Sequence, residues 1–300
     1  MGNDKQPTTL MKRAIKQIPN LLTLANAFSG MAALVCLATE EVVTAIWFVA
    51  LALIFDFADG LAARLLNAKS DLGLQLDSLA DTISFGVVPG FALFQLISST
   101  SGFYFTDITR WSLMQWGEAS LGFAVALAAV LRLARFNIDT QSRPHFLGLP
   151  VPAMTIVVLS FPLILEQQYH LNFYQPVPSY LLPVLSDTYH WDASDLLLVE
   201  LILSAPFYIV LGLCLAALML LPIPMISLKF EGLSWKTNRW RYAILIWAVI
   251  CYFIFLIPYL GWPVDMGLVD YLIVPLIMAG YFIISWIYAT FGTLNSHIGK

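Results

Sequence analysis

Four aspartates within residues 56–81, DFADGLAARLLNAKSDLGLQLDSLAD, have the chemistry and spacing to bind a cation. Asp56 and Asp59 stand three residues apart, and Asp77 and Asp81 stand four apart, so each pair shares one face of a helix. Only 11% of the chain is charged, and a dense apolar run precedes Asp56. Ionisable groups in such segments are rare and mark functional sites. The two pairs therefore predict a functional acidic cluster.

If its two helices lie side by side, the acidic cluster is predicted to bind divalent cations. The connection between the helices is short, which favours antiparallel neighbours with both acidic faces at one end. Four close carboxylates repel one another, and two cations would neutralise them. Carboxylate oxygens suit Mg²⁺, Mn²⁺ or Ca²⁺, and the lack of His or Cys disfavours zinc. The alternative, a helix cap or a solvated charge, suits Asp71 in the connecting turn but not the four acids of the cluster.

Small and basic residues beside the acids leave room for a phosphate-bearing ligand. The small residues on the acidic faces are Gly60, Ala63 and Gly73. A larger side chain at these positions would block the approach of a bulky ligand. Arg64, Lys69 and Ser70 lie at the mouth of the predicted pocket, where they could meet phosphates or a polar head group. Metal ions next to such a gap favour phosphoryl-type transfer.

Long apolar segments must position these residues, since 59% of the chain is hydrophobic. Each segment has about the 20 helical residues that cross a bilayer. The predicted spans are 20–38, 42–66, 76–99, 119–137, 150–167, 199–222, 241–261 and 269–291. The sequence thus predicts an all-α polytopic membrane protein with about eight transmembrane helices.

Basic residues give the orientation. If the N-terminus is cytoplasmic and each span reverses direction, 14 of the 15 basic residues lie inside and only Arg110 lies outside. The acidic cluster then faces the cytoplasm. We expect a cytoplasmic or interfacial segment at 1–17, a core of six transmembrane helices at 18–230 and two additional helices at 231–300. A cleaved signal peptide is the competing interpretation of the N-terminus, but the sequence lacks a convincing small-residue cleavage site.

The acidic stretch resembles the signature of the CDP-alcohol phosphatidyltransferase family. The pattern is Asp-x-x-Asp-Gly-x-x-Ala-Arg and then Gly-x-x-x-Asp-x-x-x-Asp, matched by Asp56, Asp59, Gly60, Ala63, Arg64, Gly73, Asp77 and Asp81. Other stretches resemble the phosphatidylserine synthase branch of this family: IPNLLTLANAFSG (18–30), DSLADTISFGVVPG (77–90), RLARFNI (132–138), FLGLPVPA (146–153) and PMISLKF (224–230). The resemblance implies an integral membrane enzyme that moves a phosphatidyl group from CDP-diacylglycerol to L-serine and releases CMP.

Site roles follow from the resemblance position by position. It implies that Asp56, Asp59, Asp77 and Asp81 bind the metal ions, two Mg²⁺ or Mn²⁺, and that Asp81 is also the general base. Gly60, Ala63, Arg64 and Gly73 match positions that line the CDP and diphosphate site. With Lys69 and Ser70 at the mouth, and Asn20 and Thr23 in the similar stretch 18–30, they form the expected CDP-diacylglycerol site.

The carboxylate of a serine acceptor needs a cation. Arg132 and Arg135 stand three residues apart at the cytoplasmic end of a predicted span, and Asn137 follows them. One or both arginines could grip a carboxylate with paired hydrogen bonds. They could equally extend to lipid phosphates, as arginines at helix ends often do.

Two alternatives remain open at the level of sequence. Another CDP-alcohol transferase would use glycerol phosphate, inositol phosphate or choline as the acceptor. A cation transporter would also need acids in the membrane, although its carboxylates should be scattered through the bilayer. The expected partners are CDP-diacylglycerol, L-serine and membrane lipids, with no nucleic acid. The expected location is the inner membrane of the cell, and the family implies a homodimer.

Overall fold

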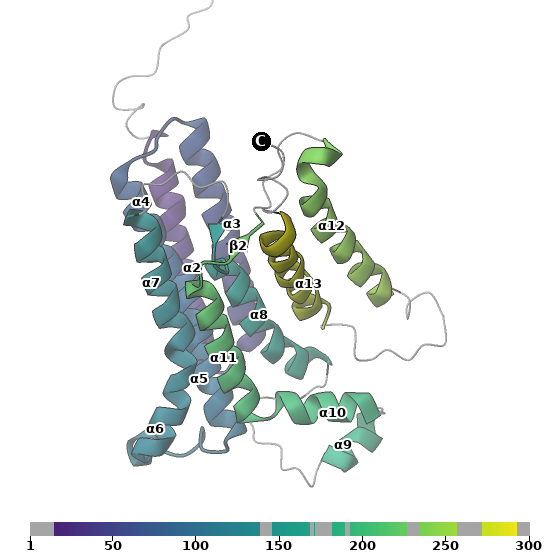
Figure 1. Ribbon diagram of the computed structural model, residues 1–300. Coiled ribbons are helices and arrows are strands. Elements are labelled where there is room, and N and C mark those ends of the chain that lie inside the picture. Colours follow the sequence, from purple (N-terminus) through teal and green to yellow (C-terminus); the bar gives the residue numbers. More distant parts are fainter. Residues whose placement is uncertain are drawn as a thin grey trace, which may run out of the picture.

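Helices form nearly all of the chain that a computed structural model describes, which is residues 15–138, 146–168, 171, 182–189, 193–226, 234–256 and 272–292 (Figure 1). The α-helices are α2 (Ile18–Ala38), α3 (Val42–Leu65), α4 (Asp71–Asp81), α5 (Val88–Thr100), α6 (Leu113–Ser120), α7 (Ala124–Ile138), α8 (Val151–Leu163), α9 (Leu182–Tyr189), α10 (Ala193–Ile202), α11 (Ala205–Leu220), α12 (Trp235–Leu256) and α13 (Ile273–Ile287). The predicted all-α class is confirmed. Most of the predicted N-terminal segment, residues 1–14, lies outside the described residues.

Short π and 3₁₀ segments and one strand pair complete the described chain. The π segments are η1 (Thr82–Val87), η4 (Ile164–Gln168) and η7 (Tyr288–Gly292), and the 3₁₀ segments are η2 (Ile108–Arg110) and η3 (Leu121–Phe123). Strands β1 (Phe146–Leu147) and β2 (Pro224–Met225) pair antiparallel, with Phe146 opposite Met225.

Within the described residues, five helical segments are long and apolar enough to cross a membrane. They are Ile18–Ala38, Val42–Leu65, Asp71–Thr100, Leu113–Ile138 and Ile273–Thr290, which agree with five predicted spans. The predicted span 199–222 is bent by 67° between α10 and α11, just before Pro206, and counts as a sixth if taken as one span. The span predicted at 150–167 is a shorter apolar helix, and the one at 241–261 falls partly on α12 and partly outside the described residues.

Large apolar side chains cover the outside of these helices. Trp47, Phe57 and Leu127 are each about 70% exposed, on α3 and α7 (69%, 71% and 70%). Lipid tails, unlike water, solvate such side chains without penalty. The chain is therefore an integral membrane protein.

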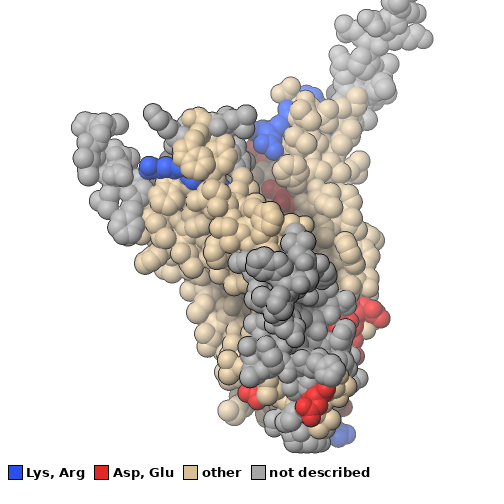
Figure 2. Space-filling model, turned by 90° about the vertical axis from the view of Figure 1, so that its right-hand side faces the viewer, with Lys and Arg blue, Asp and Glu red and all other residues tan. Residues whose placement is uncertain are grey.

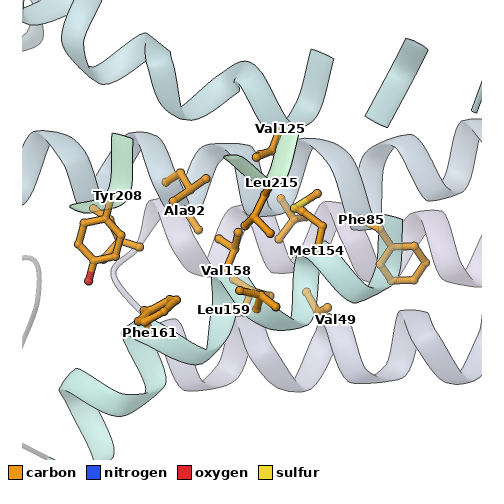
Figure 3. Close-up of a cluster of buried hydrophobic side chains, with 14 of the residues drawn as sticks. Val49, Phe85, Ala92, Val125, Met154, Val158, Leu159, Phe161, Tyr208 and Leu215 are labelled. Carbon is orange, nitrogen blue, oxygen red and sulfur yellow. The ribbon is translucent and has the colours of Figure 1, made fainter. Parts of the chain in front are cut away.

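The core lies where α3, α5, α7, α8 and α11 meet. Figure 3 shows Phe85, Met154, Val158 and Tyr208 among the side chains that meet there, and all four are buried. This packing holds α3 and the continuous helical segment from α4 to α5, which carry the four acids.

Helix α2 packs along both α3 and α4 (Figure 1). Its Gly30 lies against η1, where a Cβ atom would come within 2.8 Å of the Cα atom of Ser84. The Ser84 hydroxyl donates a hydrogen bond to the Asn26 carbonyl at 3.0 Å. Glycine thus lets two backbones approach closely, and α2 becomes the third wall of the acidic site.

The helix that carries Asp77 and Asp81 changes its winding directly after Asp81. Segment η1 has π geometry, and the next residues include Pro89, which has no N–H to donate to the Phe85 carbonyl. The Thr155 hydroxyl on α8 donates to that carbonyl instead, at 2.8 Å. Such π segments inside helices often lie at functional sites.

The last two helices pack against each other and then against the core (Figure 1). The indole N–H of Trp247 on α12 donates to the Leu276 carbonyl of α13 at 3.0 Å. Helix α13 in turn contacts α8 and β2. The C-terminal pair therefore meets the core through α13.

Candidate active site

Three of the four predicted carboxylates converge. One carboxylate oxygen from each of Asp56, Asp59 and Asp77 lies within 4.8 Å of the others. Figure 2 shows acidic side chains in a recess just below basic side chains, at the end of the molecule where α4 lies in Figure 1. The predicted convergence of the acids of 42–66 and 76–99 is confirmed for Asp56, Asp59 and Asp77.

Helix α2 fixes two of the acids from the side. The Thr23 hydroxyl lies 2.5 Å from Oδ2 of Asp59, and the Asn26 amide donates to Oδ1 of Asp81 at 3.1 Å. Asp59 and Asp81 are only 6% and 9% exposed. Each is thus oriented by a neutral hydrogen-bond donor of α2.

Asp81 stands apart from the other three acids. It interacts electrostatically with Asp56, Asp77 and Asp59, but it does not belong to the triad whose oxygens lie within 4.8 Å. Its Oδ1 accepts the hydrogen bond from Asn26, which leaves Oδ2 to meet a ligand. The geometry separates one carboxylate from three that are placed like metal ligands.

The donor set fits hard divalent cations. In the described part of the chain, no Lys, Arg or His forms an ion pair with any of the four acids. Buried carboxylates without a counter-charge are strongly unfavourable. A bound Mg²⁺ or Mn²⁺ would relieve this repulsion with the oxygen ligands that such ions prefer.

The mouth of the site is a polar recess lined by Ala63, Arg64, Asn67 and Lys69. Nε of Arg64 donates to the Gly60 carbonyl at 2.9 Å, which orients the guanidinium, and its remaining N–H groups can still bind a ligand. A Cβ atom on Gly60 would meet nothing within 4 Å. Three residues predicted for the CDP-diacylglycerol site, Ala63, Arg64 and Lys69, therefore share one open surface beside Gly60.

Three other predicted donor-site residues meet at the start of α4. The Gly73 N–H donates to the Ser70 hydroxyl at 3.0 Å, so Ser70 caps the helix. A Cβ atom on Gly73 would lie 3.2 Å from Oδ1 of Asn20, which places α2 against this turn. Asp71, which the sequence suggested as the cap, is instead the first residue of α4. Ser70 takes the cap because its backbone is extended there, which aims its hydroxyl at the first turn.

The residues predicted to bind serine separate into different environments. Arg132 is half-buried, and its Nη2 lies 3.2 Å from the Leu147 carbonyl and 3.4 Å from that of Gly148. Its Nε is buried with no hydrogen-bond partner. Arg135 is exposed. Nothing acidic in the described residues pairs with Arg132, so its charge is open to an anionic ligand.

Asn137 joins α7 to α4. Its Oδ1 accepts from Ser78 at 3.0 Å, and its amide donates to Gln75 at 3.3 Å. Eight residues before Asn137, about two turns along α7, Ala129 lies against Gly86. This regular antiparallel register puts Arg132 at about the depth of the residues directly after Asp81.

Sequence reasoning missed Asn26 and Asn67. Asn26 lies in the stretch 18–30 at three residues from Thr23, a helical spacing that places both on one face. That spacing was a usable signal. Asn67 has a positive φ of 47° in the turn after α3, a conformation that asparagine tolerates better than most residues. The backbone carbonyls of Leu147 and Gly148, which hold Arg132, could not be predicted from residue types, because every residue has a carbonyl.

Comparison with known proteins agrees with the signature. The family model described as CDP-alcohol phosphatidyltransferase matches residues 16–191. A CDP-diacylglycerol–serine O-phosphatidyltransferase of Bacillus subtilis is 34% identical over 146 residues, which are 48% of this chain and 75% of that protein. One from Helicobacter pylori is 38% identical over 154 residues, 51% of this chain and 59% of that protein. An archaetidylserine synthase of Methanothermobacter thermautotrophicus is 32% identical over 164 residues, 54% of this chain and 62% of that protein.

The aligned part contains the whole acidic site. The family match includes α2, α3, α4 and α7, which carry the four aspartates and the residues that hold them, and it spans more than half of the 300 residues. This chain therefore belongs to the CDP-alcohol phosphatidyltransferase family.

Proposed function

We propose that this protein transfers the phosphatidyl group of CDP-diacylglycerol to the hydroxyl of L-serine, giving phosphatidylserine and CMP. The observation that carries the proposal is the triad of Asp56, Asp59 and Asp77 with Asp81 beside it, on the elements that the family match covers. The serine-specific names of the relatives support the choice of acceptor.

The donor would lie with its acyl chains in the membrane and its diphosphate at the acidic recess. Arg64 and Lys69 at the mouth would bind phosphate oxygens, and Gly60 leaves room for the nucleotide. Asp56, Asp59 and Asp77 would hold two Mg²⁺ or Mn²⁺ ions, with one oxygen of Asp81 as a weaker ligand. Bound ions of this kind polarise the phosphate under attack and stabilise the charge on the departing nucleotide.

Asp81 would act as the general base. A serine hydroxyl is a weak nucleophile, so a positioned base matters. Oδ2 of Asp81 accepts the hydroxyl proton while the Asn26 amide holds Oδ1. The serine oxygen then forms a bond to the phosphorus that carries diacylglycerol, and the bond from this phosphorus to the bridging oxygen of CMP breaks. Orientation of both substrates in one site contributes several kcal/mol of the rate enhancement.

Arg132 would bind the serine carboxylate. Its guanidinium is half-buried, is fixed by two backbone carbonyls and has no acidic partner in the described residues. A half-buried guanidinium is stabilised most by an anion whose oxygens also accept its hydrogen bonds, as a carboxylate does. Arg135 and Asn137 would complete the acceptor site, Asn137 mainly by holding α7 against α4. This arrangement favours an acceptor with a carboxylate over choline, which has no anionic group.

The proposed setting is the inner membrane with the acidic recess toward the cytoplasm. The distribution of basic residues supports this orientation. We further propose that 18–230 forms the transferase core, that 1–17 and 231–300 flank it, and that the protein acts as a homodimer, as its family resemblance implies.

An acceptor panel tests the function directly. Purified protein in detergent–lipid micelles is incubated with CDP-diacylglycerol, Mn²⁺ or Mg²⁺ and one labelled acceptor: serine, glycerol phosphate, inositol phosphate or choline. We expect CMP release and a labelled lipid with serine, at a rate at least tenfold above the others. Serine offers a hydroxyl to the base and a carboxylate to Arg132, choline has no anionic group, and a phosphorylated acceptor would need more basic residues near the pocket. Faster transfer to another acceptor would refute the serine assignment but retain the family chemistry.

The two arginines can be told apart by conservative exchange. In Arg132→Lys we expect the KM for serine to rise about tenfold or more, because a lysine cannot keep both the carbonyl contacts and a paired grip on a carboxylate. The KM for CDP-diacylglycerol should change less than twofold. Arg135→Lys, at the exposed position, is the matched control with a smaller expected effect. The reverse ranking would move the carboxylate site to Arg135.

A further inference from the structure

Helix α13 binds both backbone groups of a single residue next to the core. The Tyr281 hydroxyl donates to the Ile226 carbonyl at 3.2 Å, and the Ile226 N–H donates to the Ser285 hydroxyl at 3.4 Å. Tyr281, Ser285 and Ile226 are all buried. Backbone groups left without partners in an apolar environment are costly, so these two bonds favour one docked position of α13.

Ile226 is linked through the strand pair to Arg132. It follows β2 directly, and β2 pairs with β1 at Phe146 and Leu147. The carbonyls of Leu147 and Gly148 then accept from Arg132. Three successive links thus join α13 to Arg132, the residue proposed to bind the serine carboxylate: α13 to Ile226, β2 to β1, and the Leu147 and Gly148 carbonyls to Arg132.

Gly148 makes the link stiff. Its φ is 72°, and a Cβ atom there would come within 3.0 Å of the Met219 carbonyl carbon at the end of α11. Its N–H donates to the Ile223 carbonyl at 2.9 Å. The strand pair is therefore held between α11 and α13, and we expect a shift of Ile226 to move the Leu147 and Gly148 carbonyls.

Side-chain packing beside this contact is incomplete. An apolar crevice of about 200 Å³ lies between the strand region and α13, lined by Leu149, Met225, Phe282 and Trp286 among others. Dispersion contacts are lost where a gap remains. The position of α13 against the strand pair therefore depends more on the hydrogen bonds to Ile226. Tyr281 also lies near the Arg132 guanidinium.

We propose that Tyr281 and Ser285 are positioning residues for the acceptor site: α13 holds Ile226 and the strand pair so that Arg132 is aimed at the serine carboxylate. The inference rests on the proposed function. It gives a role in the reaction to a helix outside residues 16–191, the region that the family model matches.

The test is a comparison of Michaelis constants in full-length protein. In Tyr281→Phe, which keeps the ring and removes the hydroxyl, we expect the serine KM to rise about fivefold, as loss of one hydrogen bond predicts. The kcat and the KM for CDP-diacylglycerol should stay within twofold. Ser285→Ala should shift the serine KM in the same direction. Tyr252→Phe, at an exposed tyrosine of the neighbouring helix α12, is the matched control and should change nothing.

Coupling to Arg132 is tested in the double variant. Tyr281→Phe added to Arg132→Lys should raise the serine KM no further, because the residue that it positions is already altered. Unchanged kinetics in both α13 variants, or an equal loss for serine and for CDP-diacylglycerol, would overturn the inference while wild-type activity stands. A wild type that transfers nothing to serine would overturn the proposed function, and this inference with it.

Discussion

Asp81→Asn is expected to lower kcat by about 10³-fold, because a positioned general base contributes 10²–10⁴ to such reactions. Asparagine has the shape of aspartate and can still accept the hydrogen bond from Asn26, so the fold should be unchanged. Binding of CDP-diacylglycerol should remain within a few-fold, since the oxygens of Asp56, Asp59 and Asp77 are intact. The rate of CMP release and equilibrium binding of the labelled donor measure the two effects separately.

Asp71→Asn is the control for this experiment. Asp71 is the exposed first residue of α4, ten residues before Asp81 on the same helix, and it should be neutral. An equal loss of donor binding and of turnover in Asp81→Asn would contradict the assignment of Asp81 as the general base. It would indicate that Asp81 acts mainly as a metal ligand.

Removal of divalent ions should abolish activity. After dialysis against EDTA we expect at least a 10³-fold loss of CMP release, and recovery when Mg²⁺ or Mn²⁺ is restored. The physical reason is that buried carboxylates repel one another and the anionic donor unless cations lie between them. A titration of activity against metal concentration measures the requirement.

The triad can be weakened one carboxylate at a time. Asp59→Asn should raise the metal concentration for half-maximal activity by tenfold or more, because it removes a ligand charge that Thr23 holds in place. Asp107→Asn, at an exposed acid between α5 and α6, is the control and should leave the metal requirement unchanged. Undiminished lipid synthesis after thorough chelation would refute the metal-dependent mechanism.

The local pattern of the chain was enough to predict the acidic faces. Asp56 and Asp59, and likewise Asp77 and Asp81, stand at helical spacing, and helical periodicity depends only on neighbours in the chain. Apolar run length similarly predicted the five segments that are long enough to span. The bend before Pro206 and the short helix at Val151–Glu166 were not predicted, because run length does not report where a helix breaks.

Tertiary packing decided how the acids differ from one another. The contact of Asn26 with Asp81 joins residues 55 positions apart, and it depends on how closely Gly30 lets α2 approach η1. Helical spacing alone placed four aspartates on two helices without distinguishing them, whereas the structure separates a triad from Asp81. It likewise distinguishes Arg132 from Arg135 through backbone carbonyls at Leu147 and Gly148. Main-chain groups are the same in every residue, so only the three-dimensional path of the chain reveals which side chain they hold.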